Sequence, residues 1–129
     1  YMDLEEAREA LALDPLIIGN WVRDKDQRGP DEPTPRRYHS AVVHKSSLFV
    51  YGGVPSSDVP SAEAEQSIAY RFNFNAKMWT RNQTHFLSNH SFSFIYGHST
   101  SVYHNMMYLF GGRSYKSGGY LTGLWCLNL

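Results

Sequence analysis

Several features that would direct an interpretation are scarce in this sequence of 129 residues. A single cysteine, Cys126, means that no disulfide can form within the chain. No apolar run approaches the ~20 residues that a membrane-spanning helix needs. Twelve basic residues balance twelve acidic ones, so the composition predicts no binding to nucleic acid or to an anionic membrane. Aromatic residues are abundant at 15%, which suits packing between β-sheets.

The chain does contain an internal repeat. The stretch Tyr51-Gly52-Gly53 returns 59 residues later as Phe110-Gly111-Gly112. His39 precedes the first glycine pair by thirteen residues, and His98 precedes the second pair by the same distance. A fixed spacing of this kind predicts a repeat architecture.

Each copy of the repeat is predicted to be a β-hairpin. A polar turn follows the residues after each histidine, and then comes a continuous apolar run, 48–51 in the first copy and 106–110 in the second. Continuous apolarity predicts that both faces of the strand are covered. The glycine pair that ends the run can adopt the positive φ that other residues resist, so it can turn the chain sharply out of the sheet.

A third segment extends the repeat at a different spacing. Residues 70–74 match residues 125–129 at an offset of 55, because the loop after the glycine pair is four residues shorter in the second copy. Asn73 is expected to start a turn, and Trp79 to lie on a fourth strand. Asp14 precedes Trp21 in a comparable way, which predicts the end of an earlier copy with Trp21 buried as Trp79 is.

Together these motifs resemble the kelch repeat over roughly residues 12–129. The first copy carries them in this order: Arg36-x-x-His39-Ser40, an apolar strand, Gly52-Gly53, Tyr70-x-x-Asn73, and Trp79. The second copy departs by having Ile95 and Tyr96 opposite the two arginines at 36 and 37, and asparagine replaces the usual aspartate in both copies. The resemblance implies an all-β, kelch-type β-propeller built from four-stranded blades. It also implies structural roles for the motif residues His39, Gly52, Gly53, Trp79, His98, Gly111 and Gly112.

The resemblance divides the chain into three parts. Residues 1–21 are a lead-in and the end of a preceding blade, residues 22–81 are one blade, and residues 82–129 are the next blade, incomplete at its C-terminus. We expect the remaining blades to lie outside this segment, with closure by self-association as the alternative. The lead-in is expected to mix a helix, capped by Asp3 with Glu6 in its first turn, and a strand ending near Asp14.

A protein–protein interaction scaffold is the function that the resemblance implies, rather than an enzyme. The loops after the glycine pairs, 54–67 and 113–123, leave equivalent strands and are expected on one face. Arg113, Tyr115 and Lys116 are the candidate partner-binding residues, since arginine and tyrosine are enriched at interface hot spots. Arg36 and Arg37 are expected to hold the turn that precedes the first hairpin.

Two other functions stay open. Asn82 and Asn89 lie in N-glycosylation sequons, which would suit an extracellular adhesion or receptor-like kelch module of the attractin type. An extracellular and a cytoplasmic location are equally compatible with the sequence. A propeller enzyme such as a copper-radical oxidase would need a cysteine joined to a tyrosine, but Cys126 is predicted to be a buried thiol on a strand.

No metal ion or cofactor is predicted. The six histidines show neither His-x-x-x-His spacing nor a Cys-x-x-Cys partner motif. The periodic placement of His39 and His98 instead favours a structural role in each blade.

Overall fold

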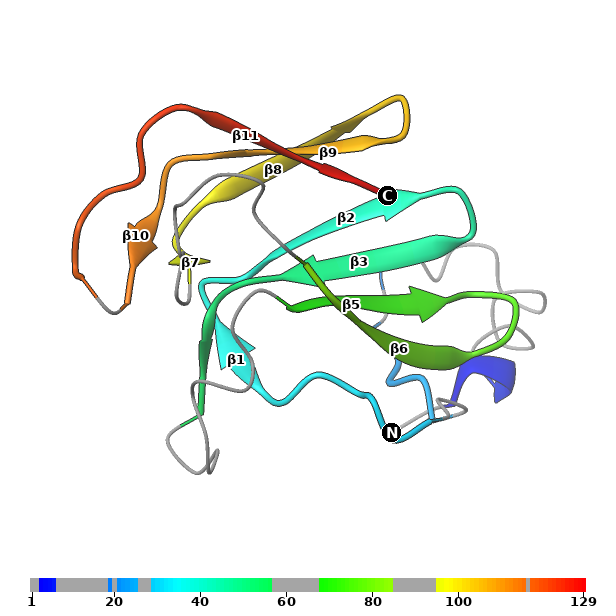
Figure 1. The fold of residues 1–129 in the computed structure, drawn as a ribbon. Coiled ribbons are helices and arrows are strands. Elements are labelled where there is room, and N and C mark those ends of the chain that lie inside the picture. Colours follow the sequence, from blue (N-terminus) through cyan, green and yellow to red (C-terminus); the bar gives the residue numbers. More distant parts are fainter. Residues whose placement is uncertain are drawn as a thin grey trace.

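The structure, a computed structural model, describes residues 3–6, 19, 21–25, 29–56, 68–84, 95–115 and 117–129. Within these ranges the chain is all-β apart from one helical turn at residues 4–6. Two antiparallel sheets follow one another along the sequence, as expected for part of a kelch β-propeller (Figure 1).

The first sheet is a four-stranded antiparallel meander in the order β2–β3–β5–β6. Its strands are β2 (Ser40–His44), β3 (Ser47–Tyr51), β5 (Ile68–Asn73) and β6 (Met78–Gln83). The second sheet has the order β8–β9–β11, with β8 (Ser99–Tyr103), β9 (Met106–Phe110) and β11 (Leu124–Asn128). In the register, Tyr51 pairs with Ala69 and Phe110 pairs with Leu124, so the two predicted offsets, 59 and 55, both hold.

Two short ladders flank the glycine pairs, and the sequence analysis did not predict them. In the first, β1 (Arg36–Arg37) pairs with β4 (Val54–Pro55); in the second, β7 (Ile95–Tyr96) pairs with β10 (Arg113–Ser114). Both ladders lie at the end of the sheets opposite the hairpin turns, which we call the ladder end (Figure 1). The loop after each glycine pair therefore leaves the molecule at this same end.

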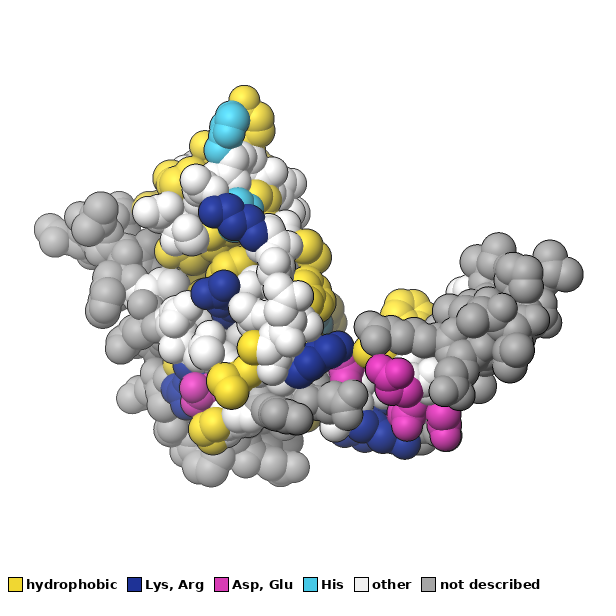
Figure 2. Space-filling model, turned by 90° about the vertical axis from the view of Figure 1, so that its right-hand side faces the viewer, with side chains coloured by type: hydrophobic (Ala, Val, Ile, Leu, Met, Phe, Trp, Pro, Cys, Tyr) yellow, Lys and Arg dark blue, Asp and Glu magenta, His cyan; other side chains and the backbone are white. Residues whose placement is uncertain are grey.

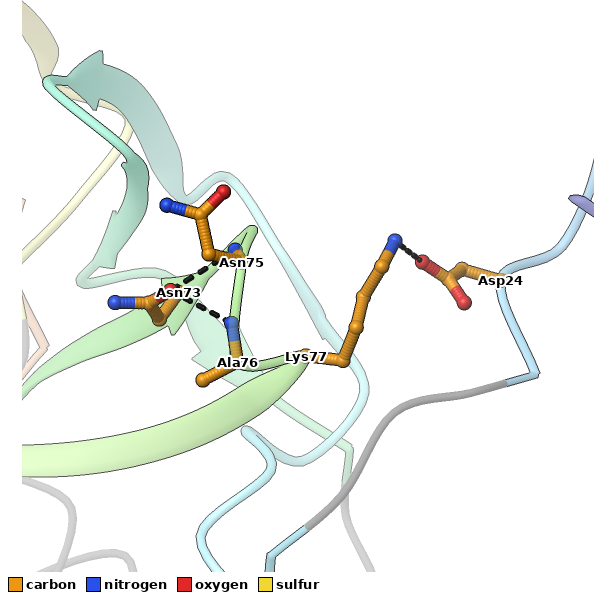
Figure 3. A network of polar contacts seen from close by, with 5 residues as sticks. All are labelled: Asp24, Asn73, Asn75, Ala76 and Lys77. Atoms are coloured by element: carbon orange, nitrogen blue, oxygen red, sulfur yellow. Dashed lines mark hydrogen bonds and ion pairs between the residues drawn. The ribbon is translucent and has the colours of Figure 1, made fainter.

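The tight turns use equivalent backbone conformations in both copies. Lys45 and His104 are the first residues of the two-residue hairpin turns, and their φ values are 53° and 52°. After β5, the Asn73 side-chain oxygen accepts hydrogen bonds from the backbone N–H groups of Asn75 and Ala76, both at 2.9 Å (Figure 3). This Asx turn is the physical reason for the asparagine at that repeat position. Trp79 follows on β6, where its ring packs 5.1 Å from that of Phe72.

The main core lies between the two sheets. Tyr51 and Ala69 of the first sheet are buried against Ile95, Met107 and Leu109 of the second part. A second cluster, Val50, Ile68 and Tyr70, occupies the other face of the first sheet. Strand β3 is therefore covered on both faces, as its continuous apolar run predicted.

The second copy departs from that prediction. In β9, Met107 and Leu109 are buried, whereas Phe110 is 63% exposed, so only one face of this strand is covered. The prediction that Cys126 is a buried thiol is wrong for the same reason. Cys126 is exposed because it alternates along β11 with Trp125 and Leu127, the residues that point into the core.

The N-terminal part gives a mixed result. Asp3 and Glu6 form reciprocal backbone-to-carboxylate hydrogen bonds of 2.8 and 3.0 Å, a capping box that starts a helical turn as predicted. The predicted strand near Asp14 lies outside the described residues. Trp21 is 100% exposed and residues 21–25 form no strand, so the predicted burial of Trp21 is wrong: none of the described sheets lies beside it to pack against.

None of the helical structure in the described part of the chain is long and apolar enough to cross a membrane.

Candidate functional site

The glycine pairs are needed because backbone and histidine atoms come close to them. A Cβ atom built on Gly52 would lie 2.4 Å from the carbonyl oxygen of Ile95 and 2.5 Å from the imidazole of His98. One on Gly53 would lie 2.8 Å from both the Arg37 carbonyl oxygen and the His39 Cβ. All of these distances are shorter than real Cβ contacts, and both glycines have positive φ, so no other residue fits without a shift.

The second glycine pair reproduces only half of this crowding. A Cβ on Gly112 would lie 2.9 Å from the Tyr96 carbonyl oxygen and from the His98 Cβ, which matches Gly53. Around Gly111 no described atom comes within 4 Å of such a Cβ. At the Cβ position, Gly53 and Gly112 are thus crowded by their own blade, whereas Gly52 is crowded by the blade that follows.

His98 lies at the joint between the two blades. It is 8% exposed, and its Nε2 is 2.7 Å from the Ser40 hydroxyl oxygen of the first blade. Its ring meets Tyr51 edge-on, with 6.0 Å between the centroids. Burial, together with the nearby His39, lowers the pKa of His98 to about 4, so the imidazole is neutral near pH 7. The equivalent His39 has an exposed side chain.

Backbone hydrogen bonds complete the joint. The N–H of Gly53 donates to the carbonyl oxygen of Ile95 at 2.8 Å, and the N–H of Gly97 donates to that of Tyr38 at 2.9 Å. These reciprocal bonds tie the glycine turn of one blade to the start of the next. A small apolar pocket also lies between the sheets, lined by Tyr51, Thr84, Ile95, Met107, Leu109, Trp125, Cys126 and Leu127.

The chemistry of this pocket does not resemble a catalytic centre. Burial raises the pKa of Tyr51, and a hydrogen bond with Thr84 offsets part of this effect, so the phenol stays protonated. Around it the lining is predominantly hydrocarbon. Within the described ranges, no three His, Cys, Asp or Glu residues come together in a way that could hold a metal ion.

Arg36 braces the first glycine turn. Its guanidinium donates to the Gly52 carbonyl oxygen at 3.2 Å and to two oxygens of Thr34 at 3.1 Å each. It also lies over the ring of Tyr70, 4.8 Å from the centroid. These contacts explain why an arginine precedes this turn. Arg37, in contrast, has an exposed side chain that lies 5.5 Å from the ring centroid of Tyr38.

The predicted partner-binding residues lie at the ladder end. Arg113 begins β10, and its guanidinium donates to the Gly118 carbonyl oxygen at 2.9 and 3.2 Å and lies 5.1 Å from the Tyr120 ring centroid. Tyr115 is 60% exposed. Lys116 lies outside the described residues. Arg113 was expected on a loop, but its ladder pairing fixes its backbone.

A row of side chains across both blades was missed by the sequence analysis. Tyr38 packs against Tyr96 with 6.2 Å between ring centroids, and Tyr96 packs against Tyr115 at 6.4 Å. Arg37 lies over Tyr38, and Arg113 pairs with Tyr96 in the second ladder. We call this set of residues the Arg–Tyr ribbon; it comprises Arg37, Tyr38, Tyr96, Arg113 and Tyr115. One signal was available in the sequence: aligning the repeats places Tyr38 opposite Gly97.

The two sequon asparagines differ in how far the structure describes them. Asn82 was placed in the linker after Trp79, but it belongs to β6, where its side chain is exposed. This strand is the outer one of the first sheet, and Asn82 pairs there with Ala69 of β5. Asn89 lies outside the described residues.

Comparisons with known proteins agree with the repeat pattern. The model of the KLHDC2/KLHL20/DRC7 Kelch-repeats domain matches residues 19–129. A "Leucine-zipper-like transcriptional regulator 1 homolog" from Drosophila melanogaster is 31% identical over 99 residues, which are 75% of this chain and 10% of that protein. The solved structure of YjhT is similar over 71% of this chain and 28% of its own, with a TM-score of 0.43 and 11% identity. The chain therefore spans about a tenth of the length of the curated relative that it matches.

Proposed function

Because the chain belongs to the kelch-repeat family, whose domains are generally protein-interaction modules, we propose that it binds a protein partner through the ladder end. The observation that carries this proposal is the Arg–Tyr ribbon, which is exposed and continues from one blade to the next. Tyr38 and Tyr115 are 59% and 60% exposed, so both rings are accessible to a partner.

The ribbon has the physical properties of a binding surface. Tyrosine offers a large, stiff contact area at a low cost in side-chain entropy, and arginine offers a planar fork of hydrogen-bond donors. Both types are enriched among the residues that carry most of the energy of protein–protein interfaces. The paired ladders hold the backbone of Arg37, Tyr96 and Arg113, so binding does not need to order it there.

Pull-down of interacting proteins by the full-length protein tests this proposal. The double variant Arg113→Ala/Tyr115→Ala should lose at least about tenfold in partner affinity, because truncating a hot-spot residue typically costs ~2 kcal/mol or more. Its melting temperature should stay nearly unchanged, since both side chains are exposed. An unchanged affinity would place the partner on another surface.

A glycosylated extracellular module is a second candidate, favoured by the exposed Asn82 side chain on an outer strand. Intact-mass measurement of secreted protein before and after enzymatic deglycosylation tests it. The Thr84→Ala variant removes the Asn82 sequon and should abolish the part of the mass change that belongs to this asparagine. If secreted protein carries no glycan, the sequons give no support to an extracellular location.

A further inference from the structure

We propose that the Arg–Tyr ribbon recognises an acidic segment of a protein partner. This inference rests on the proposed function and adds to it the chemistry of the partner. It also extends the binding surface from Arg113 and Tyr115 on the second blade to Arg37 and Tyr38 on the first.

The first argument is the distribution of charge along the chain. The balanced total conceals a separation: residues 1–32 contain nine acidic and four basic residues, whereas residues 33–129 contain three acidic and eight basic ones. The three acidic residues of the latter part, Asp58, Glu63 and Glu65, all fall outside the described residues. Within residues 33–129 the described charged side chains are all basic, those of Arg37 and Arg113 among them, and a carboxylate is the electrostatic complement of these two arginines.

The acidic side chains that the structure does describe are gathered elsewhere. Figure 2, which views the molecule from the hairpin-turn side, shows most of the acidic side chains gathered at one side with a basic group beside them, while further basic side chains and one acidic group lie on the main body. Asp24 of that segment forms an ion pair of 2.8 Å with Lys77 after β5 (Figure 3). A carboxylate supplied by this chain thus already neutralises one basic residue of the first blade, at the end away from the ribbon.

The second argument is how the two exposed arginines are held. Each guanidinium lies over a tyrosine ring, Arg37 over Tyr38 at 5.5 Å and Arg113 over Tyr120 at 5.1 Å. Stacking of this kind restricts the side chain but leaves N–H groups at the edge of the planar guanidinium able to donate. A carboxylate can accept two of these N–H groups in parallel, which makes it a suitable ligand.

The third argument is independent of charge. Tyr38 adopts a φ of 59°, a left-handed conformation that is unfavourable for an aromatic residue, and the equivalent residue of the second blade is Gly97 with a φ of 70°. A glycine would serve the backbone better at position 38. Residues held in a strained backbone conformation cluster at active sites and ligand-binding segments, and the Tyr38 side chain is 59% exposed within the ribbon.

Single-stranded nucleic acid is the competing ligand, because its bases stack on aromatic side chains and its phosphates pair with arginine. The ribbon has two arginines, one on each blade, and its described residues form no basic groove that a phosphate backbone could follow. The excess of residues 33–129, eight basic against three acidic residues, is also smaller than that of strongly basic nucleic-acid-binding domains. These observations favour a protein segment with a few carboxylates.

In the experiment, a displayed library of random 12-residue peptides is selected for binding to the intact protein. The Asp and Glu residues in the enriched peptide sequences are then counted. Selected peptides are then resynthesised, and their affinities are measured by fluorescence polarisation for the wild type, for Arg37→Gln/Arg113→Gln, and for Arg23→Gln/Arg81→Gln. The last variant is the matched control: it also removes two exposed arginines, but neither belongs to the ribbon. A 12-nucleotide single-stranded RNA is titrated in parallel.

We expect enrichment of Asp and Glu, an affinity about tenfold lower for the ribbon variant, and less than about twofold change for the control. Raising the ionic strength from 0.05 to 0.5 M should weaken binding, as salt screens exposed charges. Replacing Glu by Gln in the selected peptides should lower their affinity. The proposal is overturned if the selected peptides are not acidic, if the control loses as much as the ribbon variant, or if RNA binds more tightly than the peptides.

This test separates the two proposals. If Arg113→Ala/Tyr115→Ala lowers capture of the natural partner while selected peptides show no acidic preference, the ladder end is a binding surface but its partner is not acidic. If capture of the partner is unaffected while acidic peptides bind through the ribbon, the proposed function fails and the chemical preference of the ribbon stands.

Discussion

The two blades share a motif but differ in what the motif contacts. Tyr51 of the first blade is 6% exposed, whereas its counterpart Phe110 is 63% exposed. Gly52 is crowded by the following blade, but no atom of the described residues lies within 4 Å of a Cβ built on Gly111. The difference shows that the aromatic residue and the first glycine of each copy act mainly across the joint, on the blade that follows.

His98 shows the same relation from the other side of the joint. It belongs to the second blade, yet it binds Ser40 and packs against Tyr51 of the first. His39 occupies the same repeat position but has an exposed side chain. The same repeat position is therefore buried against the other blade in one copy and exposed in the other.

The largest contrast is expected at the aromatic residue before the glycine pair. In the 129-residue chain, Tyr51→Ala should lower the free energy of unfolding by about 4 kcal/mol, because it empties the core between the sheets. Phe110→Ala should cost less than about 1 kcal/mol, since most of its ring is already in water. Urea unfolding followed by fluorescence measures both values. Equal losses would contradict the asymmetry of the joint.

The glycine pair gives the next contrast. Gly52→Ala should cost about 3 kcal/mol, because it adds a clash with the Ile95 carbonyl oxygen to the penalty of a left-handed backbone. Gly111→Ala carries only the backbone penalty of about 1–2 kcal/mol. Thermal unfolding of both variants tests this. In a longer protein where another blade packs against Gly111, Gly52→Ala and Gly111→Ala should lower the free energy of unfolding by similar amounts.

The histidines should differ in their pH dependence. The pKa of His98 is about 4 in the folded protein, against an ordinary value of 6.5, so between these values the unfolded state binds more protons. Stability that is present above pH 6.5 is therefore lost as the pH falls toward 4, by up to about 3 kcal/mol. Urea unfolding at pH 7.0, 5.5 and 4.0 should show this loss, and His98→Gln should remove most of it. His39→Gln should keep most of it, because burial is the larger cause of the lowered pKa of His98 and His39 the smaller one; if the two variants behave alike, the assignment to His98 is wrong.

The smallest expected effect is at Tyr38, where one substitution should raise stability and weaken partner binding. Tyr38→Gly introduces the residue found at the equivalent position 97, and it should raise the melting temperature slightly, by relieving about 1 kcal/mol of backbone strain. The same variant should weaken partner binding, because it removes an exposed ring of the ribbon. A variant that loses stability instead would show that the ring contact with Tyr96 outweighs the strain.

Sequence patterns predicted the parts of the fold that depend on local spacing. The two offsets gave the strand register, Asn73 gave its turn, and Asp3 with Glu6 gave the helix cap. The buried Tyr51 and the exposed Phe110 could not be told apart, because each ends an apolar run and only the packing of another blade separates them. Trp21 was misplaced for a similar reason: a tryptophan is buried only where a sheet lies beside it.

The candidate surface was only partly predictable. Arg113 and Tyr115 were identified from residue type and position after a glycine pair. Tyr96 and Tyr38 were not, because the ribbon depends on ring contacts between residues 58 positions apart in the sequence. The separation of charge could have been found by counting residues in parts of the chain rather than in the whole.

The joint between the blades has a further mechanical consequence. Strands β2 and β8 lie side by side where the two sheets meet, whereas β6 and β11 are far apart (Figure 1). The separation between the two sheets therefore increases from their first strands toward their last. The hydrogen bonds that involve Gly53, Gly97 and Ser40 hold the two sheets together where they lie closest. Such a joint is a pivot whose angle sets the curvature of the arc that the blades follow. A small change in the angle between the sheets beside Gly52 would produce a larger displacement at the outer strands, because they lie farther from the joint.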